Sequence, residues 1–200
     1  MSVAVDRAEV RAKAYHVGNV RTTLLVQALA LLQEGGLPGL NLRALSARTG
    51  VALSSVYHHF ASKNELLAAL AVQGFDDLAG KLEAALAGGG DRIVRACVIA
   101  HFDFAWRSPE LYSLMFQVPV ARTPEVVAAR QAAFQVLEDG IAAVAVRLNR
   151  SPETVHEITV AVWTCVHGAA SLAPIQEEGH ALVETMIGGL EALFLGARQS

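Results

Sequence analysis

Residues 39–67 (GLNLRALSARTGVALSSVYHHFASKNELL) contain two short helical patterns with a tight turn between them. Asn41 is a favourable N-cap, and Leu42 and Leu45 give the first helix an apolar side. Gly50 ends this helix, because glycine adopts the left-handed conformation that lets a chain turn sharply without a side-chain clash. The spacing predicts a helix-turn-helix followed by a third helix.

The second short helix, over residues 53–60, has one apolar side. Val56 and Phe60 are four residues apart and face inward. The remaining arc carries hydroxyls, a phenol and imidazoles: Ser54, Ser55, Tyr57, His58 and His59. A helix face without carboxylates that offers these groups suits contact with phosphates and base edges of DNA.

The third helix is predicted to start at Ser62, because Ser62 and Glu65 have the spacing of a capping box. Lys63 lies in the first turn, where helices normally favour acidic residues. A nearby anion would make this lysine favourable, so it hints at phosphate binding, although many exposed lysines are simply solvated.

Residues 19–70 resemble the DNA-binding domain of TetR-type transcriptional regulators, and the pattern G-V-x-x-x-x-V-Y-x-H-F-x-S-K-x-E-L is matched without a gap over 50–66. The resemblance implies that double-stranded operator DNA is a partner. It implies phosphate contacts for Tyr57, His59 and Lys63, a DNA contact for Arg43, and base-facing positions for Leu53, Ser54, Ser55 and His58. Leu53 replaces a polar residue that is frequent there, so it either touches a thymine methyl or packs against the core.

Charge is divided unevenly along the chain. Residues 1–63 have a net charge of +4 and residues 64–200 a net charge of −7, within a total of −3. A basic DNA-facing domain on an acidic body follows from this asymmetry. Residues 1–18 include Arg7, Arg11 and Lys13 but lack periodicity, so they are predicted to form a loose arm, either touching DNA or solvated.

The fold class predicted for the whole chain is all-α, because no stretch alternates like a strand and about nine helical patterns follow one another. Three further helices each start with a hydroxyl residue, a proline and a glutamate, at 108–110, 123–125 and 151–153. The predicted domains are a flexible arm (1–18), a helix-turn-helix domain (19–67) and a ligand-binding and dimerisation bundle (68–200). The predicted helices are 20–35, 42–49, 53–60, 62–87, 91–107, 109–116, 124–148, 152–173 and 180–197.

Aromatic side chains concentrate in the first part of the bundle, although the chain is poor in them elsewhere. Pockets between bundle helices are commonly lined in this way, whereas for any single one of these aromatics plain core packing is the better explanation. The candidate ligand-binding residues, effector unspecified, are His101, Phe102, Phe104, Trp106, Tyr112, Met115, Phe116, Trp163 and His167.

Trp163, His167 and Gly168 resemble a tryptophan-histidine-glycine signature found in one C-terminal domain type of TetR-like regulators. Small residues on this helix and on the last one allow close helix approach, which predicts a two-fold four-helix interface in a homodimer. The predicted interface residues are Trp163, Gly168, Ala169, Leu172, Met186, Gly189, Leu190, Leu193 and Phe194.

Other classes of function find less support. No catalytic motif, metal spacing or cofactor motif stands out, so no enzyme activity, metal or cofactor is predicted. Cys97 and Cys165 are predicted to be reduced, buried thiols. Residues 158–176 lack charged side chains, but their polar residues and acidic flanks favour a buried helix over a membrane span. With no recognisable leader, a cytoplasmic protein is expected.

The expected function is that of a DNA-binding repressor that binds a near-palindromic operator as a dimer and is released by a small, largely apolar ligand. The alternative is a helical ligand-binding or adaptor protein without operator binding.

Overall fold

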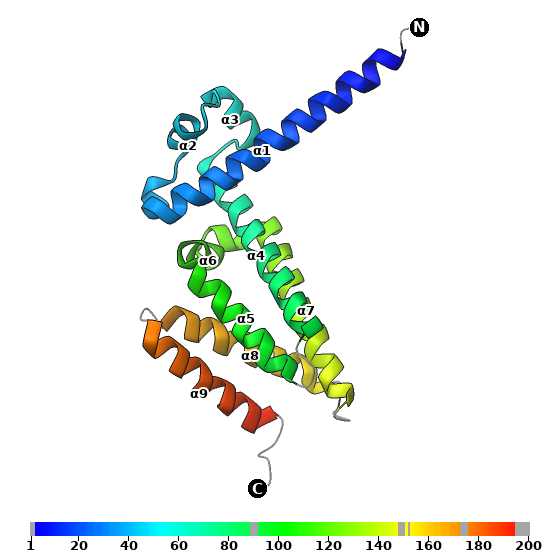
Figure 1. Ribbon diagram of the computed structural model, residues 1–200, viewed down its shortest axis with the longest axis vertical. Helices are drawn as coiled ribbons and strands as arrows, with labels where there is room; N and C mark the ends of the chain where they lie inside the picture. Colours follow the sequence, from blue (N-terminus) through cyan, green and yellow to red (C-terminus); the bar gives the residue numbers. More distant parts are fainter. Residues whose placement is uncertain (1–2, 89–91, 148–150, 152, 173–175, 195–200) are drawn as a thin grey trace.

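A computed structural model of the chain describes residues 3–88, 92–147, 151, 153–172 and 176–194 (Figure 1). Within these ranges every regular element is a helix, which confirms the all-α prediction. The buried side chains form one continuous cluster that extends from Leu24 near the N-terminal end to Leu190 near the C-terminal end. A small helix-turn-helix domain lies at one end of this core and a larger bundle at the other.

Helix α1 (Val3–Gly39) is longer than the sequence predicts, since residues 3–18 continue the helix where a loose arm was expected. The segment has no amphipathic stripe, but it contains alanines and charged helix formers and no proline, so backbone propensity alone favours a helix. Its N-terminal half projects away from the rest of the molecule (Figure 1). The helical geometry breaks at Gly36, whose φ is 60°, and this agrees with a predicted helix end at residue 35.

The next two helices are α2 (Leu42–Thr49) and α3 (Leu53–His59). Their bounds match the predicted helix-turn-helix to within one residue. Val56 and Phe60 are fully buried beneath α3, as their spacing predicts. Helix α4 (Lys63–Gly88) then runs from this domain into the bundle (Figure 1), so it crosses the predicted domain boundary at residue 67 without a break.

In its described part, the bundle contains five further α-helices and the 3₁₀ helix Val120–Arg122. The α-helices are α5 (Ile93–Arg107), α6 (Pro109–Phe116), α7 (Pro124–Arg147), α8 (Glu153–Leu172) and α9 (Gln176–Phe194). Two of the proline-marked starts are confirmed, at Pro109 and Pro124. Helix α8 begins at Glu153, next to the predicted start at Pro152, which lies outside the described residues. The Ser108 hydroxyl, however, makes no capping bond, so proline and the following acid suffice to begin α6.

Two glycines allow α4 to lie close to its neighbours. A Cβ atom on Gly74 would lie 2.7 Å from the sulfur of Met115 in α6. One on Gly140 of α7 would collide with Leu86 of α4. Because cores tolerate extra volume poorly, these contacts fix the position of α4 against α6 and α7.

Two other predictions concern the cysteines and the apolar stretch at 158–176. Cys97 is buried, and burial raises the pKa of its thiol to about 11. Cys165 is exposed on α8, so the prediction of two buried thiols is wrong for the second. The apolar stretch is divided between α8 and α9. In the part of the chain that the structure describes, none of the helices has the length and hydropathy needed to cross a bilayer.

Candidate nucleic-acid interface and ligand cavities

Local contacts hold the start of α2 and the turn that leads from α2 to α3. At the start, the Asn41 side chain accepts from the backbone N–H of Ala44 at 2.9 Å, as an N-cap does. In the turn, Gly50 has φ 68°, which is the left-handed conformation predicted for it. The Ser46 hydroxyl donates to the carbonyl of Val51 at 2.7 Å. The conformation of Gly50 and the Ser46 bond set the angle at which α3 leaves α2.

Arg48 connects α2 to α1 through a bidentate pair. Its guanidinium donates to both carboxylate oxygens of Glu34 at 2.6 and 2.7 Å, and to Gln27 at 2.8 Å. Paired N–H donors impose orientation as well as attraction. Helices α1 and α2 therefore support α3 as a unit.

Helix α3 presents the polar face that the sequence predicts. Ser54, Tyr57 and His58 are exposed, Tyr57 to 49%, while Ser55 and His59 are partly buried. Arg43 on α2 is exposed as well. Leu53 is partly buried and packs against the core, which favours the packing interpretation of this residue. The outward arc is thus confirmed, whereas the DNA contacts of its members remain predictions.

Arg21 is a candidate that the sequence analysis missed. Its guanidinium lies 5.1 Å from the centre of the Phe60 ring, an arrangement suited to a cation–π contact. Burial, His58 and Arg21 together lower the pKa of His59. Arg21 therefore adds positive charge beside the polar face of α3. Its position at the start of the 20–35 pattern, one turn before Leu24, could have suggested this role.

The start of α4 forms the predicted capping box with one difference. The Ser62 hydroxyl accepts from the N–H of Glu65 at 3.2 Å, and the Glu65 carboxylate accepts from Ala61 at 2.7 Å instead of from Ser62. The Lys63 ammonium donates to the carbonyl of Leu37 at 2.8 Å. Lys63 thus ties the end of α1 to the start of α4, while two of its three N–H donors remain for a phosphate.

Inside the bundle, Tyr112 of α6 bridges two histidines. Its hydroxyl lies 3.1 Å from Nε2 of His101 on α5 and 3.0 Å from Nδ1 of His167 on α8. Burial, and secondarily His167, lower the pKa of His101 to about 3. Burial also lowers the pKa of His167 and raises that of Tyr112 well above its usual value. All three side chains are therefore uncharged at neutral pH.

Further rings extend this bridge in two directions. The Phe116 ring lies 4.1 Å from that of His167 and 5.4 Å from that of Phe75 on α4. In the other direction, the Trp163 ring lies 5.0 Å from that of His101 and 5.6 Å from that of Phe134 on α7. This ring chain joins five helices, and the sequence analysis missed two of its members, Phe75 and Phe134.

The other predicted ligand residues are dispersed. Phe104 contacts the Tyr112 ring at 6.3 Å, and Met115 is buried against Gly74. The rings of Phe102 and Trp106 lie 5.5 Å apart, and the ligand-binding role of these two residues stays a prediction. Adjacent residues on a helix point about 100° apart, and the arc of His101 and that of Phe102 meet different neighbours.

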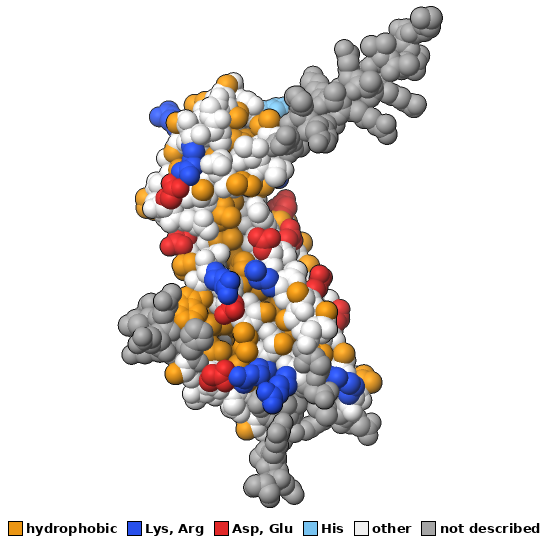
Figure 2. Space-filling view, viewed as in Figure 1, with side chains coloured by type: hydrophobic (Ala, Val, Ile, Leu, Met, Phe, Trp, Pro, Cys, Tyr) orange, Lys and Arg blue, Asp and Glu red, His pale blue; other side chains and the backbone are white. Residues whose placement is uncertain are grey.

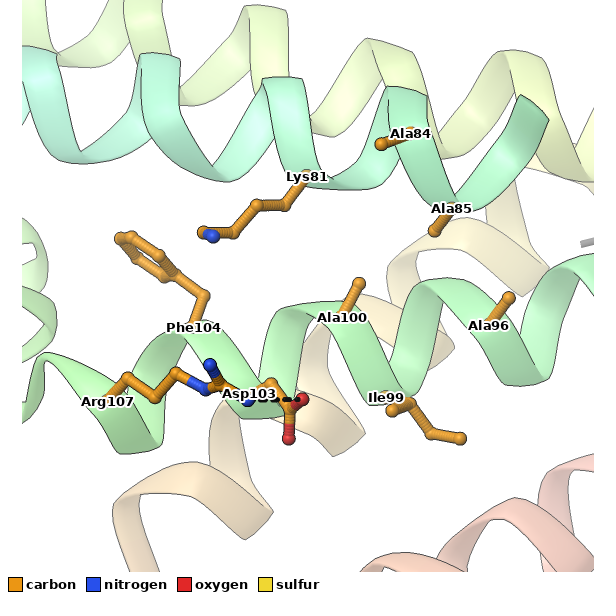
Figure 3. Close-up of a pocket in the computed structure, with 9 residues that line it drawn as sticks. All are labelled: Lys81, Ala84, Ala85, Ala96, Ile99, Ala100, Asp103, Phe104 and Arg107. Atoms are coloured by element: carbon orange, nitrogen blue, oxygen red, sulfur yellow. Dashed lines mark ion pairs between the residues drawn. The ribbon is translucent and has the colours of Figure 1, made fainter. Parts of the chain in front are cut away.

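The described part of the bundle contains several cavities, and three of them bear on a ligand site. A cavity of about 400 Å³ lies between α5, α6 and α8, and is lined by Ala105, Pro109, Tyr112, Ser113, Phe116, Gln117, His167, Ala170 and Ser171. A groove of about 490 Å³ lies between α4 and α5, with alanines on both helices and Lys81, Asp103 and Arg107 among its lining residues (Figure 3). A smaller hollow of about 170 Å³ adjoins Phe134 and Trp163. On the face drawn in Figure 2, basic and acidic side chains form mixed groups on the bundle with hydrophobic side chains between them.

The predicted interface residues of α8 and α9 differ in their burial. Gly168, Met186 and Gly189 lie at or near the surface, and a Cβ on either glycine would meet nothing within 4 Å. Ala169 and Leu190 are buried within the protomer, so their assignment to a dimer interface is corrected. Trp163 is half-buried beside His101, and its place in a dimer interface stays a prediction. The side chains of Leu172, Leu193 and Phe194 lie outside the described residues.

Comparison with protein families gives two matches. Residues 24–70 match the family model of bacterial regulatory proteins of the tetR family, and residues 94–185 match that of the Tetracyclin repressor-like C-terminal domain. The first match contains α2, α3 and the start of α4, and the second contains most of the bundle. Together they cover about two thirds of the chain.

Individual relatives agree with the family matches. The HTH-type transcriptional activator FasR of Mycolicibacterium smegmatis is 29% identical over 123 residues, which span 60% of this chain and 56% of FasR. A TetR-family transcriptional regulator from Pectobacterium atrosepticum has a TM-score of 0.71 at 21% identity, covering 91% of this chain and 95% of its own. FadR from Bacillus subtilis, in complex with stearoyl-CoA, has a TM-score of 0.69 at 13% identity, covering 88% and 99%. At these identities the two structures show the shared fold alone.

Proposed function

Since the chain belongs to the TetR family of DNA-binding transcriptional regulators, we propose that it is a repressor that binds a near-palindromic operator as a homodimer. A small, largely apolar ligand releases it from the DNA. The observation that carries the proposal is the polar arc of α3, which a capped turn presents outward while Val56 and Phe60 hold it to the core. A regulator of the chromosome acts in the cytoplasm, and this location is part of the proposal.

Each protomer would place α3 in the major groove of DNA. Tyr57, His59 and Lys63 hold phosphates in this arrangement, whereas Ser54, Ser55 and His58 face base edges. Leu53 packs beneath them. Arg43 makes a further contact with the DNA. Two copies of α3 read successive major-groove faces only when they are roughly 34–36 Å apart, so the dimer sets the spacing of the half-sites.

The bundle offers a physical route from a ligand to this spacing. Tyr112 and Phe116 line the cavity from α6, and Phe116 touches Phe75 of α4 at 5.4 Å. Helix α4 in turn begins at Lys63, which is tied to α1. A ligand that displaces α6 must therefore move α4 and the domain at its start. A preference of about 3 kcal/mol for the displaced form would weaken operator binding about 150-fold.

The named relatives bear on the ligand and on the sign of regulation. The FadR structure holds stearoyl-CoA, whose long acyl chain is apolar although its CoA part is charged, so it supports a ligand with a large apolar part. FasR is an activator, so the direction of regulation requires a direct measurement. We expect repression, and a reporter gene placed behind the operator should rise in expression when the protein is removed.

Selection of bound DNA from a random pool tests the proposal. The expected product is a near-palindrome whose half-sites lie about one helical turn apart. Binding should weaken as salt is raised, because each phosphate contact releases counterions. A protein that enriches no sequence and binds no duplex even at low salt would contradict operator binding and favour the adaptor alternative.

A further inference from the structure

The cavity between α5, α6 and α8 differs from the groove between α4 and α5 in its charges. None of its nine lining residues is Asp, Glu, Lys or Arg. Its serine and glutamine residues, Ser113, Gln117 and Ser171, are exposed and lie at the rim. By contrast, Lys81, Asp103 and Arg107 border the α4–α5 groove, where Arg107 pairs with Asp103 at 3.7 Å (Figure 3). Among the side chains that the structure describes, the first cavity therefore provides no counter-charge for an ionic ligand.

His167 is the polar group through which this cavity can bind a ligand. Its Nδ1 is occupied by Tyr112 at 3.0 Å. Its Nε2 has no hydrogen-bond partner among the residues that the structure describes. Burial lowers the pKa of this imidazole, so it is neutral near pH 7. A neutral imidazole with one nitrogen occupied can donate or accept one further hydrogen bond.

The hydrogen-bonded bridge from His167 through Tyr112 to His101 allows Nε2 of His167 either to donate or to accept. When the Tyr112 hydroxyl donates to His101, the Nδ1–H of His167 donates to Tyr112 and Nε2 becomes an acceptor. When Tyr112 donates to His167 instead, Nε2 carries the proton and becomes a donor. Both arrangements keep the two hydrogen bonds of Tyr112 and leave both histidines neutral. The bridge thus adapts His167 to a ligand hydroxyl or to a ligand carbonyl without creating a charge.

We propose that the cavity between α5, α6 and α8 is the effector site and that it selects apolar molecules whose single polar group is uncharged, such as an alcohol, a ketone or an ester, bound at Nε2 of His167. The inference rests on the proposed function, of which it specifies the ligand. Phe116, Ala105, Ala170 and Pro109 supply the apolar wall. The volume of about 400 Å³ lies at the small end of ligand sites, which span roughly 300–1,000 Å³.

Three probes of equal chain length test the selection by charge: 1-octanol, octanoate and octylammonium, with binding measured calorimetrically at pH 7.5. A charge moved into a site without a partner loses its hydration uncompensated. We expect 1-octanol to bind at least ten-fold more tightly than either ion, and 2-octanone to bind comparably to 1-octanol. Tight binding of octanoate or octylammonium, or no binding of the two uncharged probes, would overturn the inference.

Matched variants test which of the two cavities binds the ligand. Ala170→Leu fills the proposed cavity and should abolish octanol binding, whereas Ala100→Leu fills the α4–α5 groove and should leave binding unchanged. His167→Ala should weaken octanol binding roughly five-fold, the equivalent of one neutral hydrogen bond. The reverse result for the two alanine variants assigns the ligand to the groove and overturns the proposal.

Operator binding by each variant is measured in parallel by gel shift with the selected DNA. A protein that binds operator but fails the octanol test refutes this inference alone. A protein that binds octanol as expected but no operator refutes the proposed function and leaves the ligand site standing.

Discussion

His59 lies where a change of protonation would alter DNA binding. Its pKa is lowered in the free protein by burial and by its positive neighbours. A DNA phosphate beside it would raise that pKa, so DNA binding would take up a proton. Affinity should therefore increase as pH falls from about 8 to about 6, by up to ~10-fold per pH unit for one linked proton. Fluorescence anisotropy with labelled operator at several pH values measures this slope.

Replacement of either histidine on α3 provides the control. His59→Gln keeps a hydrogen-bonding side chain but cannot titrate, so most of the slope should disappear. His58→Gln should alter the preferred base instead, because His58 occupies an exposed, base-facing position. Equal slopes for wild type and the His59 variant would remove His59 from the phosphate contacts.

His101 should make the fold sensitive to acid. Its pKa is about 3 in the folded protein and about 6.5 when unfolded. Between these values the unfolded state binds more protons, so the free energy of unfolding decreases as pH falls, by up to ~1.4 kcal/mol per pH unit. Urea unfolding at pH 7 and at pH 5 should reveal this dependence. The pH dependence of the free energy of unfolding should be smaller in His101→Gln and unchanged in His58→Gln. An unchanged pH dependence in His101→Gln would contradict the role of His101.

At the scale of elements, two glycines of α4 provide a matched pair. Gly74→Ala places a methyl group against buried Met115, whereas Gly80→Ala places one in open space. The first should lower the free energy of unfolding by about 1–3 kcal/mol through overpacking, less the gain in helix propensity. The second should raise it by up to ~1 kcal/mol. Thermal unfolding of both variants measures these changes in the free energy of unfolding. Equal changes would mean that α4 and α6 are not in tight contact.

Helix boundaries were the part of the fold that local sequence could predict. Asn41, Gly50 and the three proline-marked starts act through backbone chemistry, which depends on a few neighbouring residues. The helical course of residues 3–18 was missed because periodicity measures burial of one face and this segment has no such stripe. A helix can form there through propensity without packing.

Contacts between helices were harder to predict. The sequence placed His101, Tyr112 and His167 among the candidates, but their hydrogen-bonded bridge joins residues up to 66 positions apart and depends on how α5, α6 and α8 cross. Phe75 was overlooked for the same reason. Ala169 and Leu190 face the protomer's own core because α8 and α9 must first pack within the chain.

For the whole molecule, the exposed surface of α8 and α9 decides whether two protomers can form a dimer that presents both copies of α3 to DNA. Gly189 is exposed, and Val160 and Leu182 on these helices expose 43% and 41% of their surfaces. Small and apolar residues on one face fit a second copy related by a two-fold axis. In this arrangement, α4 and the chain of aromatic rings that reaches it at Phe75 connect the DNA-binding domain to the cavity and to the interface.

Gly189→Glu should separate dimer formation from folding. No atom lies within 4 Å of a Cβ at this position, and glutamate is a better helix former than glycine, so the protomer should keep its helical circular dichroism. A charge buried between two protomers would instead be unpaired and costly. Light scattering should report a monomer, and operator affinity should fall at least ten-fold because one half-site is lost. Gly80→Glu, which adds the same charge at an exposed site on α4, should remain dimeric and bind operator. A dimeric Gly189→Glu protein with full operator affinity would place the two-fold interface on another surface.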